Sequence, residues 1–353
     1  MRTKPLGLGV IGCGVIGQRH MQAAAERPDL FRLAAVADLR AQAAAEAGRA
    51  FNVDAVYTDA SSLLEDRRVE AVVLAMPTAG RAELAIEAFS RGKHVLLEKP
   101  AAMSAQEVQR LIDAQQGLVG ACCSSRLRFL RCVGVVEDLL RKGELGEIRA
   151  IRSRGVFPIG PTPQHEPPAW RLSRSLNGGG LAMNWGCYDL DLILGLTGWR
   201  LKPQAVMARQ WAISPGFESH VARGSDGETH FIALIGCQGG LTISLERIEL
   251  APAHGETVCE IIGTKGSLRF KAITDMPNEV TLYTADPVKG TIARACWSGV
   301  EDDQPHHRGP VQDFAAAVLE GKAPKTGLKQ ALAIHQIIDA MYESARACSS
   351  VVL

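Results

Sequence analysis

Short apolar runs alternate with longer helical segments through the first third of this chain of 353 residues. The first run, Leu6–Ile11, leads into a glycine-rich turn and then a helical segment at 18–26. Five more runs follow at a similar rhythm and predict strands at 33–37, 55–57, 71–75, 94–97 and 118–122. Short strands separated by helices are typical of parallel βαβ units, so we predict a doubly wound parallel sheet.

Beyond residue 122 the pattern changes to longer β-like runs joined by short turns, which predict a mostly antiparallel sheet. These runs lie at 148–156, 204–212, 229–236, 241–249, 256–262, 267–271 and 279–284, and helices are predicted at 133–142, 181–194, 310–319 and 328–347. A chain of this length is long enough to form two domains. We therefore predict an α/β protein with a doubly wound domain at 1–122. A second α/β domain with a large, mostly antiparallel open sheet follows at 123–353.

The turn after the first run has the spacing G-x-G-x-x-G, in which each glycine has a physical role. The first glycine allows a tight turn, the second lets the backbone approach a pyrophosphate, and the third lets the helix lie close to the strand. Free N–H groups at the start of the helix bind phosphate oxygens. The residues of this turn that we predict to contact a dinucleotide are Gly12, Cys13, Gly14, Val15, Ile16 and Gly17.

Asp38 ends the second run, about twenty residues after the glycines, where a carboxylate accepts hydrogen bonds from ribose hydroxyls and repels a 2′-phosphate. NAD is therefore favoured over NADP. Arg40 is the one feature that argues for NADP, and it reads more simply as a solvated residue in the first turn of a helix. Pro77, Glu98 and Lys99 follow later strands of the same sheet and complete the predicted cofactor-binding set.

Composition and charge narrow the class of protein. The net charge of +1 gives no reason to expect nucleic acid as a partner, and no apolar run reaches the roughly 18 residues needed to cross a membrane. The apolar stretch near the amino terminus is the glycine turn itself, so we expect no signal peptide. The nine cysteines are odd in number and lack a C-x-x-C pair, which fits reduced thiols in the cytoplasm. No histidine pair has convincing metal-ligand spacing, so we expect no metal.

A lysine at the end of a strand in such a sheet has a plausible chemical role. Lys99 lies in the sequence E-K-P, directly after the predicted strand 94–97. Its cation can hydrogen-bond a substrate hydroxyl or ketone and favour ionisation of a neighbouring acid.

Together with the glycine turn, several motifs resemble the Gfo/Idh/MocA oxidoreductase family along essentially the whole chain. They are His20 after the glycines, G-K-H-V-L-L-E-K-P at 92–100, R-K-G-E-L-G-E-I at 141–148, G-G-G at 178–180, I-G-T-K-G-S-L-R-F at 262–270, Q-D-F at 312–314 and A-M-Y-E-S at 340–344. The resemblance implies a Rossmann domain, a second domain with an open sheet, and NAD(P)-linked oxidation of sugar or cyclitol hydroxyls. It also implies that Lys99 lies at the catalytic centre.

The chain departs from the family pattern in the second catalytic motif. The usual order after the glycines is Asp, His four residues later and Asp three residues beyond. Here these positions hold Asn184, Tyr188 and Asp191, which would share one face of a regular helix. A second departure is Arg81, which stands where many relatives have His, and we draw no conclusion from it.

Asn184 cannot act as a base, but a Tyr–Lys pair can replace a His–Asp pair. A tyrosine has no tautomer to fix, and a carboxylate beside it would oppose its ionisation. We therefore predict Tyr188 as general acid/base, Lys99 as the cation that favours its phenolate and orients the substrate oxygen, and Asn184 as a neutral positioner. Trp170 and Arg171 are further candidates for substrate binding, with a structural role equally open. Packing of Tyr188 on Trp185, with loss of catalysis, is the alternative for the pair.

The resulting expectation is a dehydrogenase that moves hydride between NAD and a secondary hydroxyl of a sugar, glycoside or cyclitol. An open β face must be covered, so a homodimer or homotetramer through the second sheet is expected. Two rivals remain: a glycoside-cleaving enzyme that retains its NAD and oxidises its substrate transiently, and a redox-silent protein that binds sugar or nucleotide.

Overall fold

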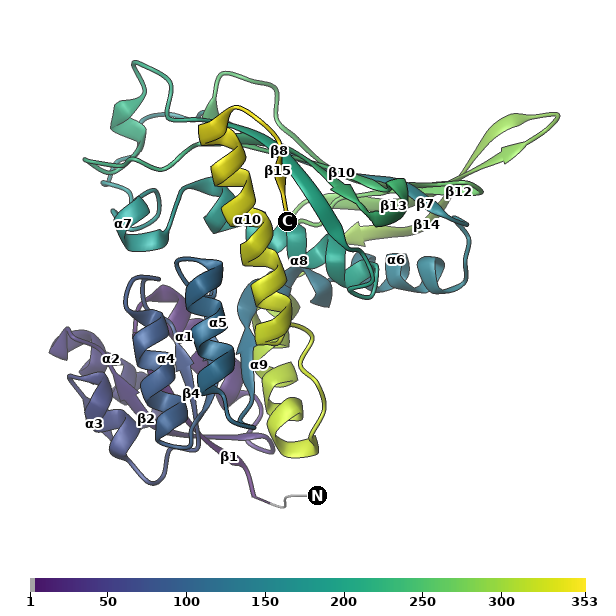
Figure 1. The fold of residues 1–353 in the computed structure, drawn as a ribbon. Coiled ribbons are helices and arrows are strands. Elements are labelled where there is room, and N and C mark those ends of the chain that lie inside the picture. Colours follow the sequence, from purple (N-terminus) through teal and green to yellow (C-terminus); the bar gives the residue numbers. More distant parts are fainter. Residues whose placement is uncertain (1–3) are drawn as a thin grey trace. The chain divides into compact units, whose positions relative to one another are not determined.

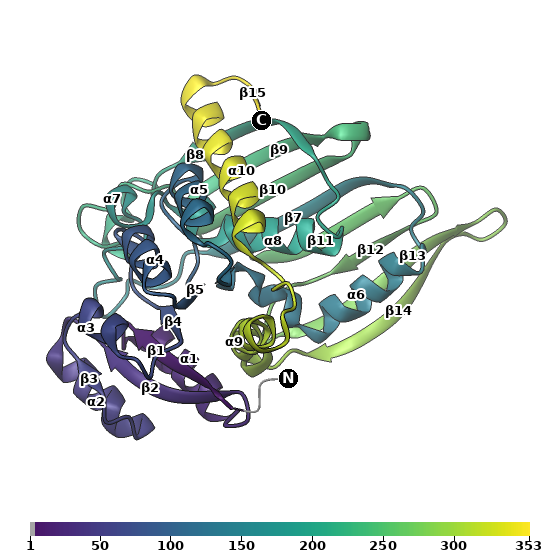
Figure 2. The ribbon, with the colours of Figure 1, turned by 60° about the horizontal axis from the view of Figure 1, so that its bottom comes forward.

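A computed structural model describes residues 4–353, with the backbone alone described at 303–305. The chain divides into two compact units, shown in Figures 1 and 2. Of the described residues, the first unit comprises 4–126 and 304–333, and the second comprises 127–303 and 334–353. Residues 304–333 thus pack with the first unit, although the predicted boundary assigns them to the second domain. The boundary between functional domains at 122 stays a prediction.

The first unit is built on a six-stranded parallel sheet in the order β3-β2-β1-β4-β5-β6. Its strands are β1 (Leu6–Ile11), β2 (Phe31–Ala37), β3 (Val56–Tyr57), β4 (Ala71–Leu74), β5 (His94–Leu97) and β6 (Gly120–Cys122). The strand order turns outward from β1 in both directions, which is the doubly wound arrangement that the sequence predicted. All six strands overlap predicted apolar runs, and the inner strands do so because both of their faces are buried.

Helices cover both faces of this sheet, and the alternation of side chains along the strands supplies two separate cores. One face packs on α1, α2 and α9, with Leu8, Met21 and Phe314 fully buried. The other packs on α3, α4, α5 and the start of α10. The bounds are α1 (Val15–Ala25), α2 (Ala41–Phe51), α3 (Ala60–Glu65), α4 (Arg81–Ser90), α5 (Ala105–Ala114), α9 (Asp303–Glu320) and α10 (Leu328–Ala347).

The second unit is built on a nine-stranded sheet in the order β14-β13-β12-β11-β7-β10-β9-β8-β15. Only β7 and β10 pair in parallel among the described strands of this sheet, so the predicted antiparallel character is confirmed. The bounds are β7 (Ile148–Pro158), β8 (Pro203–Trp211), β9 (His230–Cys237), β10 (Thr242–Ala251), β11 (Glu256–Gly263), β12 (Gly266–Phe270), β13 (Pro277–Asp286), β14 (Gly290–Val300) and β15 (Val351–Val352). Strands β14 and β15 were not predicted from the sequence.

Helices of the second unit pack on one face of its sheet, where α6 and α8 lie in Figure 2. Inward side chains such as Phe231, Ile243 and Ile261 form the core with these helices. On the opposite face β8 and β9 expose Met207, Ile232 and Leu234. The helical elements are α6 (Arg131–Arg141), α7 (Arg174–Asn177), a π turn (Ala182–Gly186), α8 (Cys187–Leu196) and the later part of α10, with short 3₁₀ turns at Cys123–Phe129, Glu218–His220 and Gln238–Gly240.

Within residues 4–353, apart from 303–305, no helix combines the length and the apolar composition that crossing a membrane requires.

Candidate active site

The glycine turn joins β1 to α1 as its spacing predicts. Gly12 has a φ of 97°, and a Cβ there would come within 2.5 Å of the carbonyl oxygen of Ala75. A Cβ at Gly17 would overlap the carbonyl oxygen of Gly12, so the helix can lie this close only with glycine. Around Gly14, by contrast, a Cβ would meet no atom within 4 Å. Gly14 is the N-cap of α1 and no side chain caps it, so the backbone N–H groups of the first turn can bind an anion.

Asp38 lies at the carboxyl end of β2 and is tied to the glycine turn. Its Oδ2 accepts a hydrogen bond of 2.9 Å from the backbone N–H of Cys13, and its Oδ1 accepts one of 2.9 Å from that of Arg40. The Arg40 side chain adds an ion pair at 3.2 Å. Burial alone would raise the pKa of Asp38, but the hydrogen bonds from Arg40 and Cys13 outweigh it and hold that pKa below its usual range. The carboxylate is therefore ionised and suited to accept from ribose hydroxyls.

Two neighbours of Asp38 complete this part of the site. Leu39, the next residue, is 90% exposed and is an apolar surface on which a flat ring can pack, a feature that the sequence analysis missed. Burial, and then the charge of Asp38, raise the pKa of the Cys13 thiol to about 11, against an opposing effect of Arg40. Cys13 therefore stays a neutral thiol at physiological pH, and its backbone N–H rather than its sulfur contributes to the site.

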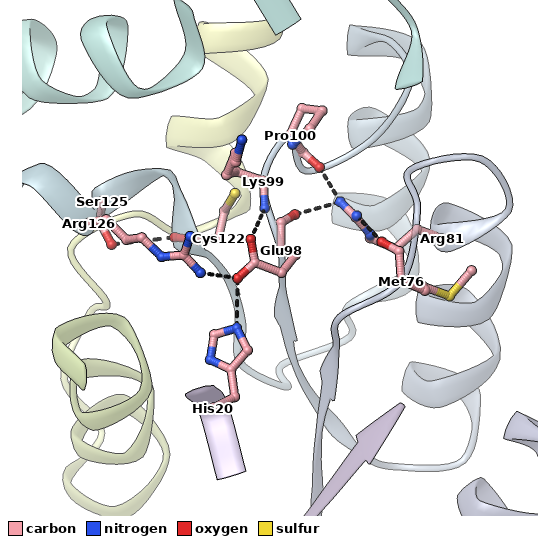
Figure 3. A network of polar contacts seen from close by, with 9 residues as sticks. All are labelled: His20, Met76, Arg81, Glu98, Lys99, Pro100, Cys122, Ser125 and Arg126. Carbon is pink, nitrogen blue, oxygen red and sulfur yellow. Dashed lines mark hydrogen bonds and ion pairs between the residues drawn. The ribbon is translucent and has the colours of Figure 1, made fainter. Parts of the chain in front are cut away.

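The E-K-P segment follows β5, and the carboxylate of Glu98 turns into the protein there (Figure 3). Its Oε1 lies 2.6 Å from His20 Nε2 and also contacts the Arg126 guanidinium. Its Oε2 accepts a 3.0 Å hydrogen bond from the backbone N–H of Lys99. Glu98 is 4% exposed, and these contacts of its carboxylate are all with groups of the protein itself. Its predicted contact with the cofactor stays a prediction.

The charges around Glu98 keep it ionised. Burial pushes its pKa upward, but the cation of Arg126, followed by His20 and Lys99, lowers it more, so the pKa lies well below its usual range. Atoms of His20, Glu98 and Cys123 lie within 4.8 Å of one another, close enough to hold a metal ion. This donor set suits a metal poorly, because Arg126 already neutralises the carboxylate and burial raises the pKa of the Cys123 thiol well above its ordinary value.

Arg81 fixes the backbone on the other side of E-K-P. It is 2% exposed, and its guanidinium donates to the carbonyl oxygen of Glu98 at 2.6 Å and to those of Pro100 and Met76. Met76 precedes Pro77 in the turn after β4, so one side chain joins the ends of two neighbouring strands. This role of Arg81 was not predicted, since a sequence does not show which carbonyl groups a side chain reaches.

The second unit carries Asn184 and Tyr188 on the segment that follows the three glycines. Asn184 lies in the π turn and Tyr188 in the first turn of α8, at 4% and 6% exposure. The predicted helical stretch at 181–194 is confirmed, but residues 182–186 form a π turn. The regular helical spacing from which a shared face was predicted therefore does not hold there. Asp191, the third member of the predicted face, is fully buried and pairs with Arg128 at 3.5 Å.

A buried carboxylate anchors the start of this segment. Glu228 accepts hydrogen bonds from the backbone N–H groups of Gly180 and Ala182 at 3.0 and 2.9 Å, and from the Tyr342 hydroxyl at 2.8 Å. Burial and the charge of Glu228 raise the pKa of Tyr342 well above its ordinary value. Tyr342 therefore remains a hydrogen-bond donor. Nothing in the pattern around Glu228 pointed to this role, because its partners are distant in sequence.

The remaining predicted residues also belong to the second unit. The ring of Trp185 lies 5.7 Å from that of Tyr188, so the packing considered as an alternative does occur. This contact fixes the tyrosine ring and does not by itself decide whether its hydroxyl reacts. Trp170 is 37% exposed, and Arg171 forms an ion pair with Glu249. The predicted role of these two residues in substrate binding stays a prediction.

The doubly wound sheet, the glycine turn and the ionised Asp38 define a dinucleotide-binding oxidoreductase. Residues 6–120 match the model of the oxidoreductase family with an NAD-binding Rossmann fold, and residues 134–269 match the GFO/IDH/MocA C-terminal domain. The chain therefore belongs to the Gfo/Idh/MocA family, and its cofactor is NAD. The predicted family, fold class and cofactor are confirmed.

Curated relatives match the chain at low identity, one of them along nearly its whole length. Levoglucosan dehydrogenase of Pseudarthrobacter phenanthrenivorans is 24% identical over 377 aligned positions, covering 96% of each protein. Inositol 2-dehydrogenase of Salmonella typhimurium is 27% identical over 166 residues, covering 46% of this chain and 49% of that protein. A solved complex of levoglucosan dehydrogenase with NADH and levoglucosan superposes with a TM-score of 0.84 at 24% identity, covering 99% of both chains. This last likeness shows the shared fold.

Proposed function

We propose that this oxidoreductase moves hydride between NAD and a secondary hydroxyl or ketone of a sugar, glycoside or cyclitol, with Tyr188 and Lys99 as its acid/base pair. The observation that carries the proposal is the placement of Lys99. Lys99 is the second residue after β5, at the carboxyl edge of the NAD-binding sheet, and Glu98 accepts a hydrogen bond from its backbone N–H. Ligands of such sheets bind at this edge. The substrate class is supported by relatives named as dehydrogenases of levoglucosan and inositol.

The residues of the first unit fit NAD. The N–H groups at the start of α1 would hold the pyrophosphate, and the open surface at Gly14 gives it room. Asp38 would accept from the ribose hydroxyls, and the exposed Leu39 would pack on the adenine. When bound, NAD supplies the hydride acceptor for oxidation of the substrate carbon.

The chain supplies the proton chemistry and the positioning. Tyr188 Oη takes the hydroxyl proton as the alcohol is oxidised and returns it in the reverse direction. Lys99 Nζ stabilises the phenolate of Tyr188 and donates a hydrogen bond to the substrate oxygen. Asn184 donates or accepts a neutral hydrogen bond that orients the substrate. Trp170 would stack on the substrate ring and Arg171, held by Glu249, would bind a hydroxyl.

The test is absorbance at 340 nm with NAD or NADP against a panel of sugars, glycosides and inositols. We expect NADH to form with one substrate class in the wild type, to vanish in Lys99→Ala, and to persist in Lys142→Ala, which changes an exposed lysine at the end of α6. Absence of NADH with every substrate would contradict the dehydrogenase. Product analysis by NMR would then separate glycoside cleavage by retained NAD from simple binding.

One observation favours a second candidate, the redox-silent binding protein. The packing of Tyr188 on Trp185 and its near-complete burial suit a structural tyrosine. This candidate predicts that NAD and a sugar bind to the protein while no deuterium passes from labelled substrate to the nicotinamide.

We also propose that the chain is a cytoplasmic homodimer or homotetramer that associates through the outer face of the second sheet. The exposed Met207, Ile232 and Leu234 lie on that face, and a monomer would leave them in water. None of the nine cysteines forms a disulfide, which suits a reducing compartment. Sedimentation of the wild type against Leu234→Lys would test the association.

A further inference from the structure

Arg81 contacts three backbone carbonyl oxygens around the E-K-P segment. Its Nη1 contacts the carbonyl oxygens of both Glu98 and Pro100, and its Nη2 contacts that of Met76. The two carbonyls held by Nη1 belong to the residues immediately before and after Lys99. Figure 3 shows both pointing toward the guanidinium, while the Lys99 side chain extends on the other side of the segment.

This arrangement fixes the backbone of Lys99 on both sides of its Cα. A carbonyl oxygen cannot turn away without rotating its peptide plane, so two held carbonyls restrict the dihedral angles between them. The planar guanidinium suits this task because its donors diverge at fixed angles, whereas an ammonium group is a single point with freely rotating donors. The third contact, to Met76, ties the same guanidinium to the end of β4.

Helix stability does not explain an arginine at this place. Arg81 is the first residue of α4, where the helix dipole disfavours a positive charge. Burial of the guanidinium adds a desolvation cost. Both effects oppose the arginine, so the contacts to the three carbonyls must compensate for them. These contacts fix the backbone from which the Lys99 side chain extends.

We propose that Arg81 is a positioning residue that sets the direction of Lys99, and through it the alignment of the substrate oxygen. The inference rests on the proposed catalytic role of Lys99. Without the guanidinium the E-K-P segment would sample other conformations, and Lys99 Nζ would spend less time where it can act. Positioning of this kind affects the chemical step more than the binding of NAD, because the glycine turn and Asp38 hold the cofactor independently.

The first arm of the test measures the segment itself and needs no activity. Hydrogen–deuterium exchange would be followed by mass spectrometry in peptides that contain residues 98–102, for wild type, Arg81→Met and Arg81→Lys. The control is Arg110→Met, which removes an exposed arginine of α5 that pairs at 3.0 Å with Glu83 of α4, the helix that begins at Arg81. We expect at least tenfold faster exchange of the Lys99 amide in Arg81→Met, an intermediate rate in Arg81→Lys and the wild-type rate in the control.

The second arm measures turnover with the substrate found in the 340 nm assay. We expect kcat to fall at least tenfold in Arg81→Met with the KM for NAD within twofold, and part of kcat to return in Arg81→Lys. In Arg81→Ala, millimolar guanidinium chloride should restore turnover while sodium chloride does not. A general loss of structure would instead lower NAD affinity and show no rescue.

The two arms separate failure of this inference from failure of the proposed function. If the wild type oxidises no substrate, the exchange rates still decide whether Arg81 fixes the segment. Wild-type exchange in both Arg81→Met and Arg81→Lys would overturn the inference, as would an unchanged kcat in an active enzyme. If Arg81→Met does not fold, Arg81→Lys decides: wild-type exchange and kcat in that variant count against the positioning role.

Discussion

His20 Nε2 and Glu98 Oε1 lie 2.6 Å apart in the interior of the first unit, where their side chains are almost fully buried. His20 follows the glycine turn on α1, and Glu98 precedes the lysine of E-K-P. The contact therefore links the element expected to hold the pyrophosphate to the one expected to hold the catalytic lysine. Arg126 supplies the charge that allows the carboxylate to remain ionised there.

Replacing Arg126 by methionine should destabilise the first unit by about 3–5 kcal/mol, because it leaves Glu98 buried without its main cation. Calorimetric unfolding of the full chain at pH 7 measures this. The matched control, Arg110→Met, removes an exposed pair with Glu83 and should cost no more than about 1 kcal/mol. Equal effects of the two substitutions would contradict a dominant role for the Arg126–Glu98 pair.

The same network predicts a pH dependence. The pKa of Glu98 is lower in the folded protein than the value of about 4.3 expected in an unfolded chain. Its ionisation therefore stabilises the fold fully above about pH 4.3, and this contribution is lost as the pH falls further toward the folded pKa. The difference in Tm between the wild type and Glu98→Gln should be largest near pH 7 and shrink between pH 5 and 3. A Tm difference that stays constant between pH 5 and 3 would contradict the stabilising role of the ionised Glu98.

Gly14 and Gly17 should respond differently to alanine. Gly14 has an ordinary φ of −71° and open space around it, so Gly14→Ala should keep the wild-type Tm while its methyl group crowds the pyrophosphate. We expect NAD to bind at least about tenfold more weakly, a loss of about 1.4 kcal/mol. Gly17→Ala should lose both Tm and affinity, because its Cβ would overlap the carbonyl oxygen of Gly12. Tight NAD binding by Gly14→Ala would place the phosphates elsewhere.

The sequence predicted those parts of the fold in which burial produces a recognisable pattern of apolar residues. The inner strands of the parallel sheet were found because they are buried on both faces and appear in the sequence as continuous apolar runs. The edge strand β3, in which Val56 is exposed, was predicted from the short run at 55–57. In contrast, β14 was missed. It is an edge strand with one neighbour, and most of its residues are exposed, so its sequence has no apolar alternation to recognise.

Helix ends show a similar limit. The first of the two closing helices was predicted from the sequence to begin at Pro310. The structure begins α9 at Asp303 and holds Pro310 inside it. Motif spacing located Asp38 and Lys99 correctly at strand ends, since local chemistry determines both. It did not reveal Arg81, Arg126 or Glu228 as supports, because their partners are chosen by tertiary packing.

Asp38→Ser should shift the cofactor preference from NAD toward NADP. The substitution removes the acceptor for the ribose hydroxyls and the charge that repels a 2′-phosphate, and it releases Arg40 from its ion pair. Loss of hydrogen bonds to a charged group predicts a fall of about 10- to 100-fold in kcat/KM for NAD. The double variant Asp38→Ser/Arg40→Ala should show the same loss with NAD and no gain with NADP. A gain that survives removal of Arg40 would show that another group binds the phosphate.

Tyr188→Phe should lower kcat by at least about 100-fold, within the usual contribution of a general acid/base. The substitution keeps the ring that packs on Trp185 and removes only the hydroxyl, so NAD affinity and Tm should remain close to wild type. Tyr283→Phe on β13 is the matched control, and it should leave kcat unchanged. Near-normal turnover in Tyr188→Phe would assign the proton transfer to another group, since a phenyl ring has no proton to exchange. A comparable loss in Lys99→Ala, with no further loss in the double variant, would show that the two side chains act as one unit.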